Sequence, residues 1–118
     1  MDGFDLREAV QTLLKFREER DWNQFHTPKN LAVSVCIEAA ELLEHFQWRK
    51  DEEIDKYLKS DALDKVKEEI ADVAAYLMML SHDLGIDLNS AMLEKIEKNA
   101  VKYPLDKCKG RHNKYNNL

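Results

Sequence analysis

Two pairs of acidic residues have the spacing that could hold a metal ion between two helices. Glu38 and Glu41 lie three residues apart, and Glu69 and Asp72 repeat that spacing further along the chain. Side chains three residues apart leave a helix on the same face. Clustered carboxylates repel one another unless a cation offsets their charge, and their oxygens suit a hard divalent ion. We therefore expect these four residues to bind Mg²⁺ or Mn²⁺, although acids in so charged a chain can also form solvated helix faces.

An aromatic residue follows each acidic pair at the same distance. Trp48 lies seven residues after Glu41, and Tyr76 lies seven residues after Glu69. Seven helical residues rise by about 10 Å, so a stacked base and a metal-bound phosphate could share one helix face. In an antiparallel pair of helices the two aromatic residues would point to opposite ends. A single ligand could then contact both aromatic residues only if two subunits shared the site. Alternatively, both residues could simply be part of the protein core and contact no ligand.

Polar residues on other segments could complete a nucleotide site. Lysine and amide groups bind phosphate oxygens well. Lys95, Asn99 and Lys102 lie on one face of the last expected helix, and Tyr103 follows them. The same residues would also suit a solvated helix face. His26 lies near Trp22 in an expected loop, where it could contact a base or pack against the protein.

A transition-metal site is a further alternative, because His45 follows Glu41 by four residues. Carboxylate-bridged di-iron bundles, however, use Glu-x-x-His pairs, and the sequence has none.

Four long helices and one short one are expected to position these residues. Asp5 is the expected N-cap of the first helix, Thr27 with Pro28 begins the second, and Gly85 ends the long fourth one. In that long helix apolar residues recur with alternating spacings of three and four, which is typical of a helix-packing seam: Leu63, Val66, Ile70, Val73, Leu77, Leu80 and Leu84. The expected ranges are 6–20, 27–48, 51–58, 61–84 and 87–102.

Length and composition agree with an all-α protein built around a four-helix-bundle-like core of antiparallel helices. The chain has 118 residues, enough for a single domain over 1–118, and only 3 Gly and 2 Pro interrupt it. No apolar run could span a membrane and no signal peptide is evident, so a cytoplasmic location is expected. The net charge of -5 argues against a nucleic-acid polymer as partner. Residues 105–118 are expected to form a flexible basic tail.

At the acidic, aromatic and polar residues described above, the sequence resembles the all-α nucleotide pyrophosphohydrolases of the MazG type, most closely their dCTP pyrophosphatase branch. The two acidic pairs match the family's Glu-x-x-Glu and Glu-x-x-Asp pattern. Further likeness lies in residues 20–26, 28–31, 41–48, 72–77 and 95–104, and it extends over about residues 5–115. One position departs from the vertebrate enzymes of the branch: Leu13 stands where they present a histidine to the base.

The resemblance implies a homodimer or dimer of dimers that cleaves the α–β phosphoanhydride of a nucleoside triphosphate with Mg²⁺. The implied metal ligands are Glu38, Glu41, Glu69 and Asp72. Trp22, Trp48 and Tyr76, with His26 beside them, would line the base pocket, and Lys95, Asn99, Lys102 and Tyr103 would face the phosphates. Glu41 is our candidate for the general base, with Glu38 as the second catalytic residue.

Two alternatives from other classes stay open at this stage. The chain could be a non-catalytic helical dimerisation module whose acids keep it soluble, or a carboxylate-bridged di-metal bundle protein. The preferred base also stays open among dCTP, modified dCTP, dATP and dUTP.

Overall fold

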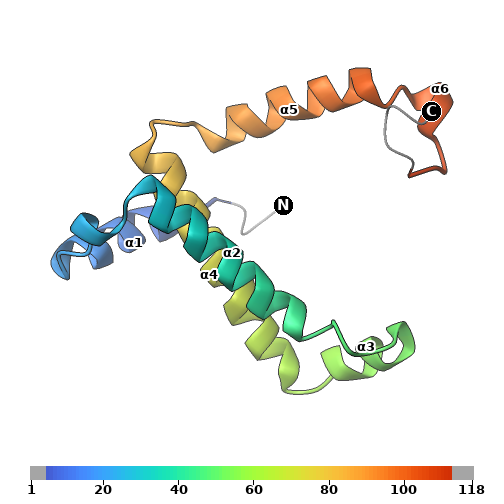
Figure 1. Cartoon of the computed structure of the whole chain (residues 1–118), viewed down its shortest axis with the longest axis horizontal. Coiled ribbons are helices and arrows are strands. Elements are labelled where there is room, and N and C mark those ends of the chain that lie inside the picture. Colours follow the sequence, from blue (N-terminus) through green and yellow to red (C-terminus); the bar gives the residue numbers. More distant parts are fainter. Residues whose placement is uncertain (1–4, 113–118) are drawn as a thin grey trace. The chain divides into compact units, whose positions relative to one another are not determined.

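The computed structural model of the chain describes residues 5–112, and every regular element in that range is helical (Figure 1). The all-α prediction is therefore confirmed for this part of the chain. The elements are α1 (Arg7–Glu19), the 3₁₀ helix η1 (Asn23–Phe25), α2 (Pro28–Glu44), α3 (Asp51–Leu58), α4 (Ala62–Asp83), α5 (Leu88–Lys102) and α6 (Leu105–Cys108).

The helix starts follow local capping chemistry. Thr27 accepts a hydrogen bond from the backbone N–H of Asn30 at 3.1 Å, and Pro28 occupies the first turn of α2. Asp87 caps α5 in the same way through the N–H of Ser90 at 3.2 Å. After α4, Gly85 has a φ of +66°, which a residue with a Cβ rarely adopts. These three boundaries agree with the sequence prediction.

Other boundaries differ from the prediction. The N-cap of α1 is Leu6 rather than Asp5, although the Asp5 carboxylate still accepts the N–H of Arg7 at 3.1 Å. Helix α2 ends at Glu44, and turns carry the chain through Trp48. The expected flexible tail contains α6, and its last part, residues 113–118, lies outside the described residues.

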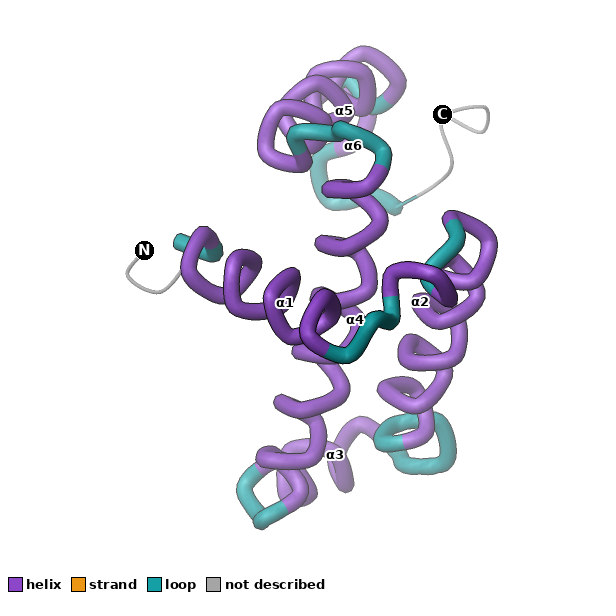
Figure 2. The backbone as a smooth tube through the Cα atoms, turned by 90° about the vertical axis from the view of Figure 1, so that its left-hand side faces the viewer, coloured by secondary structure: helices purple, strands orange, loops and turns teal. Residues whose placement is uncertain are grey.

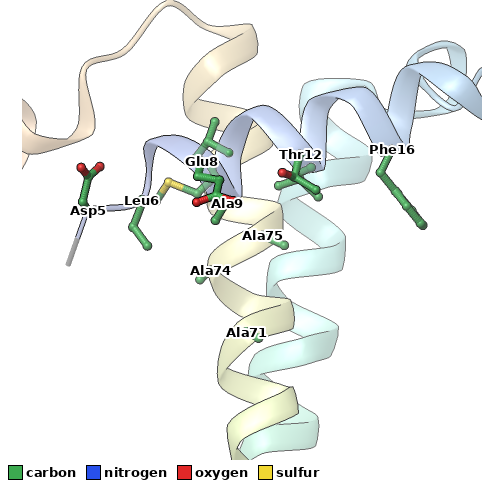
Figure 3. A pocket seen from close by; sticks show the side chains of 12 residues that line it. Asp5, Leu6, Glu8, Ala9, Thr12, Phe16, Ala71, Ala74 and Ala75 are labelled. Atoms are coloured by element: carbon green, nitrogen blue, oxygen red, sulfur yellow. The ribbon is translucent and has the colours of Figure 1, made fainter. Parts of the chain in front are cut away.

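The chain divides into two units, the first ending at Leu84 and the second beginning at Gly85. In the first unit α2 and α4 run antiparallel and side by side, joined through α3 (Figures 1 and 2). Helix α1 crosses α4 instead of running along it (Figure 3). The second unit contains α5 and α6. The prediction of a single domain over 1–118 stays a prediction.

The first unit has a small core and a large apolar surface. Among the described residues, the buried apolar side chains are Leu31, Val66 and Met79. Four residues of the predicted seam, three on α4 and Leu84 directly after it, are instead substantially exposed: Leu63, Ile70, Leu77 and Leu84. Helix α2 adds Val33, Ile37 and Leu43 to the exposed apolar residues. The seam is therefore only partly covered by the chain itself.

Candidate active site

Packing of α2 against α4 brings three of the four predicted acidic residues together. One carboxylate oxygen each of Glu38, Glu41 and Glu69 lies within 4.8 Å of the other two. Glu38 and Glu41 come from one face of α2, and Glu69 comes from α4. Asp72 lies one helical turn after Glu69 and is outside this tight group. We refer to Glu38, Glu41 and Glu69 as the carboxylate cluster.

The carboxylate cluster is electrostatically unfavourable without a cation. The Oε2 atoms of Glu38 and Glu69 are buried and have no hydrogen-bond partner among the described residues. Desolvation, followed by contact with Glu41 and repulsion from the neighbouring acids, raises the pKa of Glu38 to about 7. Desolvation and Glu41 also raise the pKa of Glu69. The charge of Asp72 contributes to both increases, which shows that it belongs to the same electrostatic system.

The donor set fits a hard divalent cation. Such an ion would coordinate the buried oxygens and offset both the desolvation and the repulsion that raise these pKa values. The cluster offers carboxylate oxygens and, within residues 5–112, no histidine or cysteine joins it. His45, considered above for a transition metal, instead forms a 2.6 Å hydrogen bond between its Nδ1 and the Tyr57 hydroxyl. This arrangement favours Mg²⁺ or Mn²⁺ over a softer ion.

A cavity of about 150 Å³ contains Asp72 in its wall. Three of the four predicted base-binding residues also line it, namely Trp22, His26 and Tyr76. The ring centroids of Trp22 and His26 are 6.4 Å apart, and those of His26 and Tyr76 are 6.5 Å apart. The other lining residues are Leu13, Phe16, Arg17, Ala75 and Met79. We call this space the aromatic cavity. Because Asp72 lines it and also raises the pKa values of Glu38 and Glu69 through its charge, we place the aromatic cavity next to the carboxylate cluster.

Arg17 in the wall of the aromatic cavity was not predicted from the sequence. Its two terminal nitrogens each donate to one carboxylate oxygen of Asp83, both at 2.8 Å, across 66 positions of sequence. The Arg17 side chain is 7% exposed and that of Asp83 27%. Burial and the nearby Arg17 lower the pKa of His26, so its ring is held neutral more firmly than in water. The sequence signal that could have identified Arg17 is its position four residues after Leu13, on the apolar face of the first helix.

The remaining predicted site residues are Trp48 in the first unit and four residues of the second unit. Trp48 is 84% exposed and does not line the aromatic cavity. Its turn is held by Arg49, which donates to the His45 carbonyl at 2.6 Å and lies 3.6 Å above the Tyr57 ring. Lys95, Asn99 and Lys102 lie on α5 and Tyr103 follows it, all in the second unit. Their role toward phosphates stays a prediction.

A second and larger cavity, of about 790 Å³, lies between α1 and α4 and is mostly apolar. Figure 3 shows Leu6, Ala9 and Thr12 of the α1 region above Ala71, Ala74 and Ala75 of α4. None of the residues of the carboxylate cluster lines it. This groove is therefore an apolar surface rather than part of the metal centre.

No helix among the described residues is both long and apolar enough to cross a membrane.

Comparison with known proteins places the chain in a family. The model of the MazG-like family matches residues 33–118. The chain is 38% identical over 105 residues to bovine dCTP pyrophosphatase 1 and 37% identical over 105 residues to the human protein. Each alignment covers 88% of this chain, and the chain spans only 62% of the length of these relatives.

A solved structure gives the same result at the level of the fold. A pyrophosphatase from Archaeoglobus fulgidus is similar with a TM-score of 0.79 and 45% identity. That match covers 88% of this chain and 96% of the other. The family resemblance seen in the acidic pairs is therefore confirmed, and the chain belongs to the MazG-like family.

Proposed function

We propose that this chain is a Mg²⁺-dependent nucleoside triphosphate pyrophosphohydrolase. It would cleave the α–β phosphoanhydride of a deoxynucleoside triphosphate, dCTP or a related nucleotide, to the monophosphate and pyrophosphate. The observation that carries the proposal is the carboxylate cluster, with its two buried and unpartnered oxygens, next to a cavity lined by aromatic rings. The names of the relatives, dCTP pyrophosphatase and pyrophosphatase, support the same reaction.

The chain's own residues can be given roles in this reaction. Glu38, Glu41, Glu69 and Asp72 would hold Mg²⁺, which when bound would offset phosphoryl charge and lower the pKa of a water molecule. Glu41 would accept the proton of the attacking water, and Glu38 would orient the same water or share the proton. Attack at the α-phosphorus in line with the leaving group would expel pyrophosphate.

The size of the aromatic cavity favours a single-ring base. A cavity of about 150 Å³ in another protein holds one benzene ring, and the aromatic cavity has about that volume. A pyrimidine ring would fill a space of this volume, whereas the two fused rings of a purine would extend beyond it. This argument supports dCTP, its modified forms or dUTP over dATP.

A second copy of the chain would complete the site. Trp48 is exposed at the α2–α3 turn, whereas Tyr76 lines the aromatic cavity, so one chain does not bring them to one ligand. The exposed seam residues of α4 and the groove between α1 and α4 leave apolar surface that a monomer in water would not favour. We therefore propose a homodimer or homotetramer in which the active site is shared between subunits.

Incubation of the protein with each deoxynucleoside triphosphate and Mg²⁺ tests the activity. The expected products are the nucleoside monophosphate and pyrophosphate in equal amounts. In H₂¹⁸O the label should enter the monophosphate, because water attacks the α-phosphorus; label in pyrophosphate would refute the proposed site of attack. Glu41→Gln should abolish turnover, and Glu44→Gln, an exposed residue on the same helix, is the matched control. No pyrophosphate from any nucleotide at high protein concentration would favour a non-catalytic helical module.

A further inference from the structure

We propose that Arg17 is a base-reading residue of the aromatic cavity: its Nε–H donates a hydrogen bond to a carbonyl oxygen of the nucleobase, while Asp83 holds the guanidinium in position. This inference rests on the proposed function, because it takes a nucleotide as the ligand.

The ion pair with Asp83 leaves one donor of Arg17 unused. Both terminal nitrogens donate to Asp83 at 2.8 Å, which is the two-pronged geometry that arginine makes with a carboxylate. The Nε atom is buried and has no hydrogen-bond partner among the described residues. Buried N–H groups without partners are rare in folded proteins. The unused donor therefore indicates a missing acceptor.

The location of Arg17 indicates where that acceptor would come from. Arg17 lines the aromatic cavity together with Trp22 and Tyr76. His26 lines the same cavity, and its Nδ1 is also buried without a partner among the described residues. Aromatic walls with two unsatisfied nitrogens suit a flat heteroaromatic ring that carries its own hydrogen-bonding groups.

Charge distinguishes a base from a phosphate as the ligand group. Because Asp83 neutralises the guanidinium, the Arg17–Asp83 pair has no net charge to offset a phosphate, and Asp72 in the same wall adds a negative charge. A neutral carbonyl oxygen can accept from Nε without that penalty. In cytosine this oxygen is O2. Asp83 is then a positioning residue, because it acts on the ligand only through Arg17.

Arginine Nε–H resonances in the ¹⁵N-labelled protein test the proposal directly. The signal of Arg17 can be assigned by scalar couplings and by its loss in Arg17→Lys, with Arg7→Lys as control on the exposed end of the same helix. Titration with dCMP and Mg²⁺, which gives no turnover, should move the Arg17 signal to lower field and slow its exchange with water. The 2-thio analogue of dCMP, a weaker acceptor, should move it less.

Kinetics provide a second readout that a purely structural role would not produce. Arg17→Lys should lower kcat/KM for dCTP by about tenfold or more, as expected for loss of one hydrogen bond from a charged donor. The loss should be smaller for 2-thio-dCTP, because the deleted bond is already weakened there. Equal losses for both substrates would contradict base reading and leave Arg17 a structural residue.

The outcomes separate this inference from the proposed function. If dCMP shifts other signals while the Arg17 signal stays in place, the inference is wrong and nucleotide binding stands. If no signal of the protein responds to dCMP or to any other nucleotide, the proposed function is wrong as well. An Arg17 signal already protected from exchange in the ligand-free protein and unchanged by dCMP would indicate a bound water as its acceptor, which also overturns the inference.

Discussion

Binding of Mg²⁺ should weaken about tenfold between pH 8 and pH 6. The pKa of Glu38 is raised to about 7, chiefly by desolvation and then by its neighbours Glu41, Asp72 and Glu69. With that pKa the ionised fraction of Glu38 falls from about nine-tenths at pH 8 to about one-tenth at pH 6. A cation must displace the proton to use both oxygens, so the apparent affinity changes by about the same factor.

The measurement is titration calorimetry with MgCl₂ alone at pH 8, 7 and 6, in two buffers of different ionisation enthalpy. About one proton per metal ion should be released at pH 6 and few at pH 8. Glu38→Gln should bind Mg²⁺ more weakly and lose this pH dependence, whereas Glu44→Gln should keep it. Equal wild-type affinity at pH 6 and pH 8 would refute the argument that Glu38 is a ligand with a raised pKa.

The same shift has a consequence for stability without metal. Because the folded pKa of Glu38 is raised above its unfolded value, the folded protein holds more protons in this window. The contribution of Glu38 to the stability of the folded state is present below about pH 4.5 and is lost as the pH rises through about 7. The melting temperature of the metal-free wild type should therefore fall relative to Glu38→Gln over this range, and MgCl₂ should restore it. An unchanged difference between the two proteins would contradict this sign.

Three further predictions concern other parts of the chain. Asp83→Ala leaves the buried guanidinium of Arg17 unpaired and should destabilise the fold by about 3 kcal/mol, which lowers Tm by ~10 °C. Asp64→Ala on the same helix is the control. A Tm unchanged in Asp83→Ala would refute the role of the ion pair. Trp48→Ala should raise KM more than it lowers kcat, because a stacked base is bound alike in ground and transition states; equal losses of kcat and kcat/KM would contradict base stacking. Ile70→Glu should shift sedimentation towards the monomer, unlike Lys65→Glu, and an unaltered sedimentation coefficient would exclude the seam as the subunit interface.

The local structure followed from local chemistry. The capping residues Thr27 and Asp87 and the glycine at position 85 act on their own backbone neighbours, so short windows of sequence contained the whole cause. Helix α3, Asp51–Leu58, also has the predicted bounds. The end of α2 was predicted too late, because a helix of this composition could continue to Trp48. Contacts of His45 and Arg49 with Tyr57, which lies on the next helix, stabilise the turns instead.

The seam of α4 shows a different limit. Its spacing predicted a packed face, and four of its seven residues are exposed in the single chain. The spacing of apolar residues indicates that a helix face is apolar, but it does not specify what covers that face. A helix of the same chain and a helix of a second copy require the same spacing. We propose that the second subunit covers the four exposed seam residues.

The sequence by itself determined which acids share a helix face, because the helical repeat places residues three apart on one side. It also determined the family, because the acidic pairs occur within a longer matching pattern. Only the tertiary structure decided that Glu38, Glu41 and Glu69 meet tightly while Asp72 lines the aromatic cavity, and that Arg17 pairs with Asp83. These arrangements depend on the angle and register at which α1, α2 and α4 pack. That packing sums many weak contacts between distant residues, and no single window of sequence contains it.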